Sequence, residues 1–192
     1  MEFIRDFFSA ISPLSDKTWK EIRPLFQHRK LVPQEYFVEE NSYARELAFL
    51  GKGCVRAFFT NAAGKEYNKQ FFVGPSLIGA YTSLLTGEKN LIPQQALTSC
   101  DIWAAEYQKL EKHFDDFHDL ERLARKIAEH YFLEKERKEL EMALKDATQR
   151  YAIFQANFPG LEQEIPQYHI ASYLSISPTQ LSRIRANLSK GS

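Results

Sequence analysis

The sequence predicts an α+β protein in which a small β-barrel or roll lies between N-terminal helices and an all-helical C-terminal part. Three observations predict this order. Short strand-like pieces split by Gly and Pro fill residues 28–106, helical periodicity starts at about residue 107, and residues 165–188 have the spacing of a helix-turn-helix. We therefore expect three units, at 1–107, 108–145 and 146–192.

Composition sets the limits of the interpretation. With 44% hydrophobic and 14% aromatic residues, a chain of 192 residues can bury a core, so disorder is not expected. Positive and negative residues balance at 25 each. The overall charge therefore argues neither for nor against a nucleic-acid partner, and any such surface must be local.

Neither a metal site nor a membrane segment is predicted. Cys54 and Cys100 lie far apart and have no Cys or His neighbours at metal-binding spacing, so two small buried thiols are the simpler interpretation. The N-terminal apolar run carries charges and does not look like a signal peptide. No run approaches the length of a membrane span. We expect a soluble cytoplasmic protein without a membrane partner.

Helices are predicted at the N-terminus, within residues 3–27. Phe3, Phe7, Phe8 and Ile11 share one helical face. A start signal at Ser15-Asp16 precedes a second apolar stripe, formed by Trp19, Ile22, Leu25 and Phe26.

Strands are predicted by apolar or alternating pieces between turn residues. They cover residues 36–38, 47–50, 54–59, 66–73, 76–80, 94–98 and 102–106. Turns are expected at Gly51–Gly53, Asn61–Gly64 and Gly87, with a short helix at 81–85.

A long helix is predicted after the strands. Its apolar residues keep spacings of three and four, and are Leu110, Phe114, Phe117, Leu120, Ala124, Ile127 and Tyr131. This pattern fits a coiled-coil-like seam between two chains, or a helix lying on its own domain. The charge-dense stretch that follows, with Leu133, Leu140 and Leu144 as its apolar stripe, is interpreted as a hinge helix.

The C-terminal segment has the pattern of a helix-turn-helix. Ile170, Ala171 and Leu174 share a face of a first short helix, and Ile176 is the apolar residue of the turn. Ser177 is a good N-cap, and Pro178 a good first helical residue.

The second helix is predicted to bury Leu181, Ile184 and Leu188 and to turn Thr179, Gln180, Ser182, Arg183 and Ala186 outward. Polar groups near a helix N-terminus are what a recognition helix presents to base edges, although ordinary helix pairs share this spacing. Arg183, Arg185 and Lys190 make this end modestly basic, because residues 165–192 contain no acidic residue.

An enzyme is not expected. The five histidines are scattered, His113 and His118 do not share a helical face, and no Ser or Cys is paired with a positioned His. The more serious alternative is a ligand- or protein-binding module whose helix-turn-helix no longer binds DNA, which the zero net charge favours.

In its order of β-roll, central helix and helix-turn-helix, the chain resembles the family of cyclic-AMP receptor protein and fumarate–nitrate reductase (CRP/FNR) regulators. The closest local matches are Ile170-Ala-Ser-Tyr-Leu-Ser-Ile-Ser-Pro-Thr-Gln-Leu-Ser-Arg183, Gln149-Arg-Tyr151, Gly79, Leu84-Leu-Thr-Gly87 and Gln95-Ala-Leu97. The resemblance implies a jelly-roll-like double-stranded β-helix as sensor, a central dimerisation helix, double-stranded DNA as partner, and RNA polymerase if the protein is an activator.

Two departures concern the effector. Cyclic-nucleotide-binding members have Glu after the Gly at position 79 and an Arg on the next strand, where this chain has Ala80 and Gln94 or Gln95. A neutral amide cannot replace the charge-assisted pair that a buried phosphate needs, so cyclic AMP and cyclic GMP are not expected to bind. The degenerate effector pocket is expected at Gly79, Ala80, Tyr81, Thr82, Gln94, Gln95 and Ala96.

No cofactor is implied, because the chain lacks the Cys set of an iron–sulfur cluster and an evident haem ligand pair. An unknown small-molecule effector and constitutive competence both stay open.

The resemblance also assigns the recognition helix. Thr179 replaces the family's usual Glu, Ser182 and Arg183 keep its small-polar-then-Arg arrangement, and Ser175 replaces its turn Gly, at some strain. The predicted DNA-binding residues are Ser177, Thr179, Gln180, Ser182, Arg183 and Arg185. We expect Arg183 to read a guanine and Gln180 an adenine, with Ser182 and Arg185 on phosphates. Alternatively, Arg183 folds back onto Glu162 or Glu164.

Overall fold

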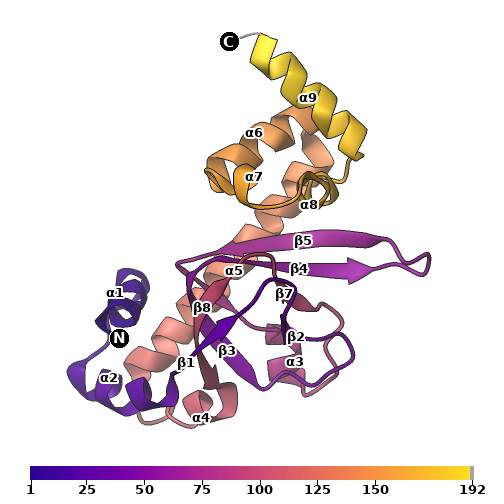
Figure 1. Ribbon diagram of the computed structural model, residues 1–192. Coiled ribbons are helices and arrows are strands. Elements are labelled where there is room, and N and C mark those ends of the chain that lie inside the picture. Colours follow the sequence, from indigo (N-terminus) through magenta and orange to yellow (C-terminus); the bar gives the residue numbers. More distant parts are fainter. Residues whose placement is uncertain (191–192) are drawn as a thin grey trace.

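A computed structural model describes residues 1–190 and contains a β-roll of two sheets (Figure 1). Its strands are β1 (Gln27–Leu31), β2 (Tyr36–Val38), β3 (Glu46–Lys52), β4 (Cys54–Thr60), β5 (Glu66–Val73), β6 (Ser76–Ile78), β7 (Gln94–Ala96) and β8 (Cys100–Glu106). Sheet A has the order β1-β8-β3-β6, and sheet B the order β2-β7-β4-β5. The predicted α+β class is confirmed.

Strand register decides which side chains face the roll interior. All pairs are antiparallel, and in sheet B Arg56 lies opposite both Gln95 and Phe71. Because side chains alternate along a strand, Val55 points into the roll while its neighbour Arg56 points away from it. The interior is filled by small and branched apolar side chains, contributed by Leu31, Ala48, Leu50, Val55, Ile78, Ala96, Cys100, Ile102 and Ala104.

Helices cover the outer face of sheet A. They are α1 (Glu2–Ile11), α2 (Asp16–Ile22), the 3₁₀ turn η1 (Arg23–Leu25) and the first half of α5 (His118–Leu144). Ser15 caps α2 as predicted, its Oγ accepting from the Thr18 N–H at 3.1 Å. Ile4, Phe8, Trp19, Ile22, Phe49, Leu120 and Leu123 are central members of this second core.

The predicted long helix begins later than expected. The structure has α4 (Tyr107–Glu111), then a turn over residues 112–117, and α5 only from His118. Phe114 and Phe117 both pack on the second core from within this turn. Tertiary packing therefore outweighs helical periodicity here.

Strand β1 was not expected. Its first four residues, 27–30, are exposed, and its last residue, Leu31, is buried. A polar sequence of this kind suits an edge strand, and β1 lies at the edge of sheet A, paired with β8.

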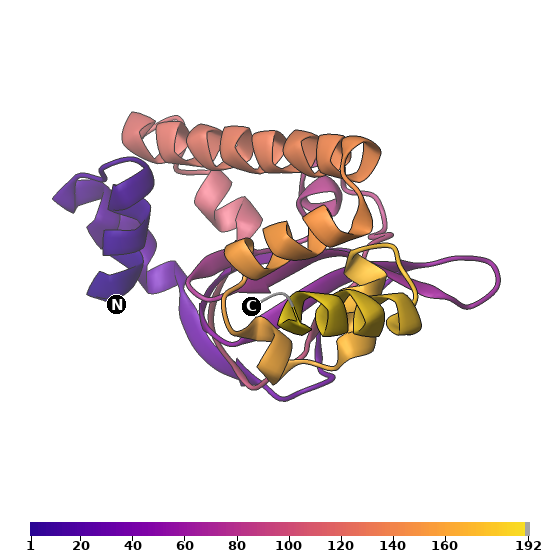
Figure 2. The same ribbon diagram turned by 90° about the horizontal axis from the view of Figure 1, so that it is seen from above.

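The helical unit, residues 146–190, consists of α6 (Ala147–Asn157), α7 (Leu161–Glu164), α8 (Gln167–Tyr173) and α9 (Pro178–Lys190). A capping box between Asp146 and Gln149 starts it directly after α5. Its core is continuous with the outer face of sheet B, because it includes Cys54, Phe71 and Leu97. The unit thus lies on β4 and β5 of its own chain, as Figures 1 and 2 show.

Candidate nucleic-acid interface

The turn between α8 and α9 has the predicted geometry. Ser175 adopts a left-handed backbone with φ of 55°, the conformation that the expected glycine would adopt freely. Ile176 packs against the core of the helical unit. Ser177 then caps α9, because its Oγ accepts from the Gln180 N–H at 3.1 Å.

Helix α9 has one buried and one exposed face. Leu181 and Ile184 are 1% and 8% exposed and pack on α8 and α6 residues. Leu188 was expected on this face but keeps 42% of its surface exposed, so the buried stripe ends at Ile184. The predicted DNA-binding residues Ser177, Thr179, Gln180, Ser182, Arg183 and Arg185 are all exposed.

The position of α9 leaves that exposed face accessible within one chain. The helix lies at the end of the molecule remote from the β-roll (Figure 1) and is nearest the viewer when the molecule is seen from above (Figure 2). A long straight partner such as a duplex can therefore approach α9 without meeting the β-roll.

The two arginines of α9 differ in their surroundings. Within residues 1–188, whose side chains the structure describes, no ion pair involves Arg183, and the alternative pairing with Glu162 or Glu164 is not formed. Glu162 instead accepts from the Tyr151 hydroxyl at 2.5 Å. Burial and this carboxylate raise the pKa of Tyr151 to about 12, and nearby Arg185 opposes the rise. Arg185 thus lies beside its own unit.

The predicted effector pocket is not a single cavity. Gln94 points into the roll, where its Nε2 donates to the Gly79 carbonyl at 3.0 Å. Gln95 points to the opposite face of sheet B, as the alternation of a strand requires. Tyr81 and Thr82 are exposed on α3 (Tyr81–Thr86), whereas Ala80 and Ala96 are buried. The residues proposed from the resemblance therefore face in three directions.

The predicted seam residues lie against their own domain. Leu110 and Leu120 are each 6% exposed, and Phe114, Phe117 and Ile127 pack on the same second core. Ala124 is half-buried, and the Tyr131 hydroxyl donates to the Leu77 carbonyl at 3.1 Å. The other interpretation, a helix lying on its own domain, describes these positions apart from Ala124, for which no contact with the second core is found. The large exposed apolar residues of α5 are instead Phe132, Leu133, Leu140 and Leu144.

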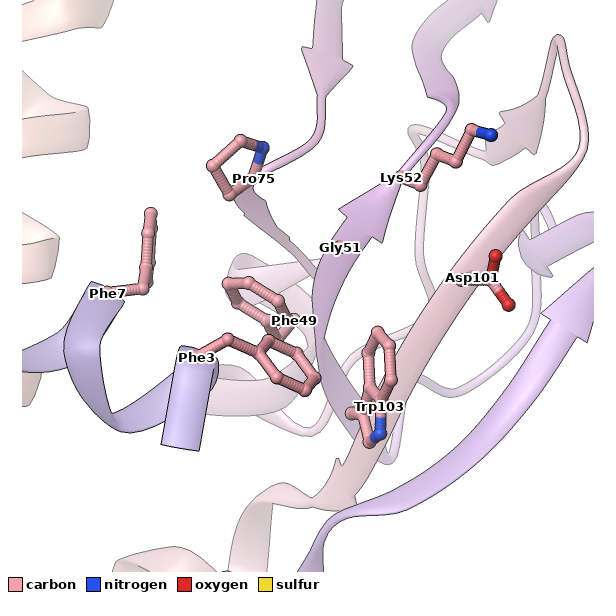
Figure 3. A pocket seen from close by; sticks show the side chains of 8 residues that line it. All are labelled: Phe3, Phe7, Phe49, Gly51, Lys52, Pro75, Asp101 and Trp103. Atoms are coloured by element: carbon pink, nitrogen blue, oxygen red, sulfur yellow. The ribbon is translucent and has the colours of Figure 1, made fainter. Parts of the chain in front are cut away.

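A cavity of about 530 Å³ lies between α1 and sheet A, outside the roll (Figure 3). Phe3 and Phe7 of α1 pack against Phe49 and Trp103 of the sheet along its wall, with ring centres 4.7 to 5.8 Å apart. Gly51 lines the cavity as well. A Cβ on Gly51 would come within 2.6 Å of the Trp103 ring, so this strand position needs glycine. The walls are mostly apolar, and Lys52 and Asp101 are the two charged residues among those that line the cavity.

Sequence reasoning missed the polar contacts between the helical unit and the roll. Arg56, Asn68, Gln95 and His169 are all buried and hydrogen-bonded to one another. One signal was visible, because Arg56 is the single charged residue in a strand that is otherwise apolar at its centre. Its hydrogen-bond partners are separated from it by 10 to 113 positions, so no local pattern could name them.

The comparisons with known proteins concern the fold. No protein-family model matches the chain, and no curated protein sequence matches it either. Solved structures do match. FixK2 from Bradyrhizobium japonicum is 16% identical, with a TM-score of 0.77 over 86% of this chain and 85% of that one.

Two further structures give the same result. CLP, a c-di-GMP-responsive global regulator of Xanthomonas campestris, is 16% identical, with a TM-score of 0.70 over 92% of this chain and 93% of that one. A crp/fnr-family protein of Eubacterium rectale is 13% identical, with a TM-score of 0.72 over 93% and 85%. The chain therefore has the fold of CRP/FNR-type transcriptional regulators.

Two absences concern the part of the chain that the structure describes. None of the helices is long and apolar enough to cross a membrane. No cluster of three or more His, Cys, Asp or Glu side chains suited to a metal ion occurs among residues 1–190.

Proposed function

We propose that this chain is a DNA-binding transcriptional regulator that acts as a homodimer. The observation that carries the proposal is the exposed polar face of α9, which starts at a capped N-terminus and lies at the free end of the helical unit. The fold, shared with CRP/FNR-type regulators over most of the chain, supports the same interpretation.

The contacts follow from the positions on α9. Gln180 and Arg183 are three residues apart and lie on one side of the helix. The planar guanidinium of Arg183 can reach O6 and N7 of a guanine, and the Gln180 amide can pair with an adenine edge. Ser182 and Thr179 flank them, where phosphate contacts set the register without reading sequence. Arg185 can contact a phosphate only if its side chain gives up its interaction with Tyr151 of the same helical unit.

Dimerisation is part of the proposal, but through different residues than the periodicity suggested. Leu133, Leu140 and Leu144 are spaced by seven and four residues, so they lie along one face of α5, and each is 56% to 73% exposed. Pairing of this face with a second copy would bury it. A two-fold dimer then requires a palindromic site with half-sites about one helical turn apart.

Cyclic AMP is not proposed as the effector. The interior of the roll presents the neutral Gln94, whose Nε2 is already bonded to the Gly79 backbone, and a cyclic phosphate would find no charged partner there. Two alternatives are compatible with the site: the protein binds an effector of another chemical class, or it is active without any effector. RNA polymerase is a partner only if the regulator activates transcription.

The test starts by selecting bound fragments from a pool of genomic DNA and measuring their affinity at two salt concentrations. We expect a palindromic site whose binding weakens steeply with salt, because phosphate contacts release counterions. Arg183→Ala should cost about 1–3 kcal/mol at that site and relax the preference at one guanine per half-site.

Arg122→Ala, an exposed arginine on α5, is the matched control and should leave both properties unchanged. If wild-type protein shows no salt-dependent binding to any fragment, the proposal fails. The alternative, a sensor module whose helix-turn-helix no longer binds DNA, would then be favoured.

A further inference from the structure

Beside the apolar core that the helical unit shares with sheet B, a small set of polar groups joins this unit to the β-roll. We call this set the interdomain cluster: Arg56, Glu66, Asn68, Gln95, His169 and Ser172. Strand β5 and helix α8 bond directly. The Asn68 N–H donates to Ser172 Oγ at 2.9 Å, and the Ser172 hydroxyl donates to the Glu66 carbonyl at 3.1 Å. Asn68 Nδ2 donates to the His169 carbonyl at 2.9 Å. These bonds hold α8 at one register on β5.

Arg56 lies at the centre of the interdomain cluster and is 4% exposed. Its Nε and Nη2 donate to Gln95 Oε1 at 2.9 and 2.7 Å, and its Nη1 donates to Glu66 Oε2 at 2.5 Å. The guanidinium carbon is 3.7 Å from the centre of the Phe58 ring. Among residues 1–188, one carboxylate pairs with this buried cation, and that carboxylate is at the solvent edge, with its side chain 44% exposed.

His169 can take part in the interdomain cluster only as a neutral ring. Its Nδ1 lies 3.2 Å from Asn68 Nδ2 and 3.4 Å from Arg56 Nη1. Both neighbours are donors, and a guanidinium has no acceptor at all, so Nδ1 must be the acceptor and carry no proton. The ring is 3% exposed, and its Nε2 finds no hydrogen-bond partner among the residues that the structure describes.

A second proton on this ring would be disfavoured by burial and by the Arg56 charge, and favoured by the Glu66 carboxylate. Arg56 faces it from β4, and Glu66 acts on it from β5. Its own helix supplies Tyr168, whose ring centre is 4.1 Å away, and Ser172. Burial, and then the Arg56 charge, lower the pKa of His169 from 6.5 to about 4, against the opposing effect of Glu66. Protonation would also remove the acceptor that Asn68 and Arg56 share.

We propose that the interdomain cluster is a proton-sensitive lock, in which neutral His169 keeps the helical unit on the β-roll and its protonation releases α8 from β5. The proposal concerns the contact between two parts of one chain and does not rest on DNA binding. A gel-shift experiment that fails would leave it standing.

The direction follows from proton linkage. When α8 is released, His169 regains an ordinary pKa of about 6.5, so the released form binds the proton more tightly than the docked form. Docking is therefore at full strength above that value and weakens as the pH falls toward 4, the docked pKa. Between pH 7.5 and pH 5.5 the equilibrium between docked and released forms should shift by about tenfold.

The experiment measures hydrogen exchange of the Asn68 amide by NMR, corrected for intrinsic exchange rates, because this N–H donates across the interface. We expect its protection factor to fall about tenfold from pH 7.5 to pH 5.5. His169→Asn places an uncharged acceptor oxygen near the position of Nδ1 and should make the protection independent of pH in this range. His118→Asn, at an exposed histidine of α5, should behave like the wild type.

A second measurement covers the case in which His169→Asn does not fold. The His169 ring is titrated by NMR in the wild-type protein, where we expect a midpoint well below 6.5. A midpoint at or above 6.5, a wild-type protection factor that does not change with pH, or an equal fall in His169→Asn would each overturn the proposal.

Discussion

Ser175 and Ser177 lie two positions apart in the turn before α9 and contribute to stability with opposite signs. The left-handed backbone of Ser175 costs about 1 kcal/mol relative to a glycine. The Ser177 side chain instead stabilises α9 by accepting from the Gln180 N–H, and its removal typically costs about 1 kcal/mol.

Ser175→Gly should therefore raise the melting temperature by about 2–4 °C, and Ser177→Ala should lower it by a similar amount. Scanning calorimetry of both variants beside the wild type checks this. A lower melting temperature in Ser175→Gly would show that the extra chain freedom of glycine outweighs the relief of strain.

Asp119 joins the N-terminal helices to α5 and makes the stability of the folded chain depend on pH. It accepts from the Ser15 N–H at 2.7 Å and from the Thr18 hydroxyl at 2.6 Å. Partial burial acts to raise the pKa of Asp119, but these hydrogen bonds outweigh burial and lower the pKa below its ordinary 3.8. The stabilisation is therefore complete above about pH 4 and is lost as the pH falls through the lowered value.

Asp119→Asn should cost about 1–2 kcal/mol at neutral pH, and the gap to wild type should narrow below pH 4. Urea unfolding over a pH series measures it, with the exposed neighbour Asp116→Asn as control. If the difference in unfolding free energy between wild type and Asp119→Asn stayed constant with pH, the stabilising role of the Asp119 charge would be contradicted.

Residue-level features could be predicted from sequence where their partners are local. The caps at Ser15 and Ser177 and the left-handed turn at Ser175 each involve residues within three positions of one another. His169 and Arg56 are 113 positions apart, and their buried contact exists only because β4 and α8 meet in the fold. Polar residues of this kind look like surface residues in the sequence.

At the scale of elements, α5 carries two apolar faces with different partners. The face with Leu120, Leu123 and Ile127 packs on the chain's own second core, whereas Leu133 and Leu140 are exposed on the later turns. We expect Leu133→Glu combined with Leu140→Glu to shift the sedimentation of a dimeric wild type toward a monomer without a loss of helix.

Two comparisons sharpen this test. Tyr43→Glu with Leu91→Glu changes equally exposed apolar residues away from α5 and should leave the dimer intact. Phe117→Glu with Ile127→Glu should unfold the N-terminal half instead, because both side chains pack inside one chain. A wild-type monomer at micromolar concentration would end the idea of this seam.

Helices and strands could be predicted from the sequence where one buried face determines the spacing of their apolar residues. Strands β3 to β5 and the helices of the helical unit follow from alternation, spacing and turn residues. The edge strand β1 was missed because four of its five residues are exposed, and the start of α5 was placed too early because α4 and the following turn keep helical spacing. In both cases packing against the neighbouring core determines where the element lies, and the periodicity of the sequence does not reveal this packing.

At the scale of the whole molecule, Phe71 links the two parts of the chain. This β5 side chain is 1% exposed and contacts Phe154, Phe158 and Tyr173 of the helical unit. Phe71→Ala should cost about 3–5 kcal/mol and separate the unfolding of the helical unit from that of the roll.

The chain offers a convenient readout, because Trp19 and Trp103 both lie in the second core and the helical unit contains no tryptophan. In urea, fluorescence and far-UV circular dichroism should coincide for wild type and for the control Phe59→Ala, an exposed residue. In Phe71→Ala the loss of helix should come first. Coincident curves in that variant would contradict a shared core.

The shared core also bears on how such a chain can be cut or recombined. The residue at which α5 ends looks like a natural boundary, yet Cys54, Phe71 and Leu97 complete the core of the segment that follows. A fragment that starts at Asp146 would expose Phe154 and Tyr173 to solvent, and a graft onto another roll would meet strands with the wrong side chains. Helix α9 therefore does not belong to an exchangeable module, and we expect changes in sheet B and in the helical unit to require compensation in each other.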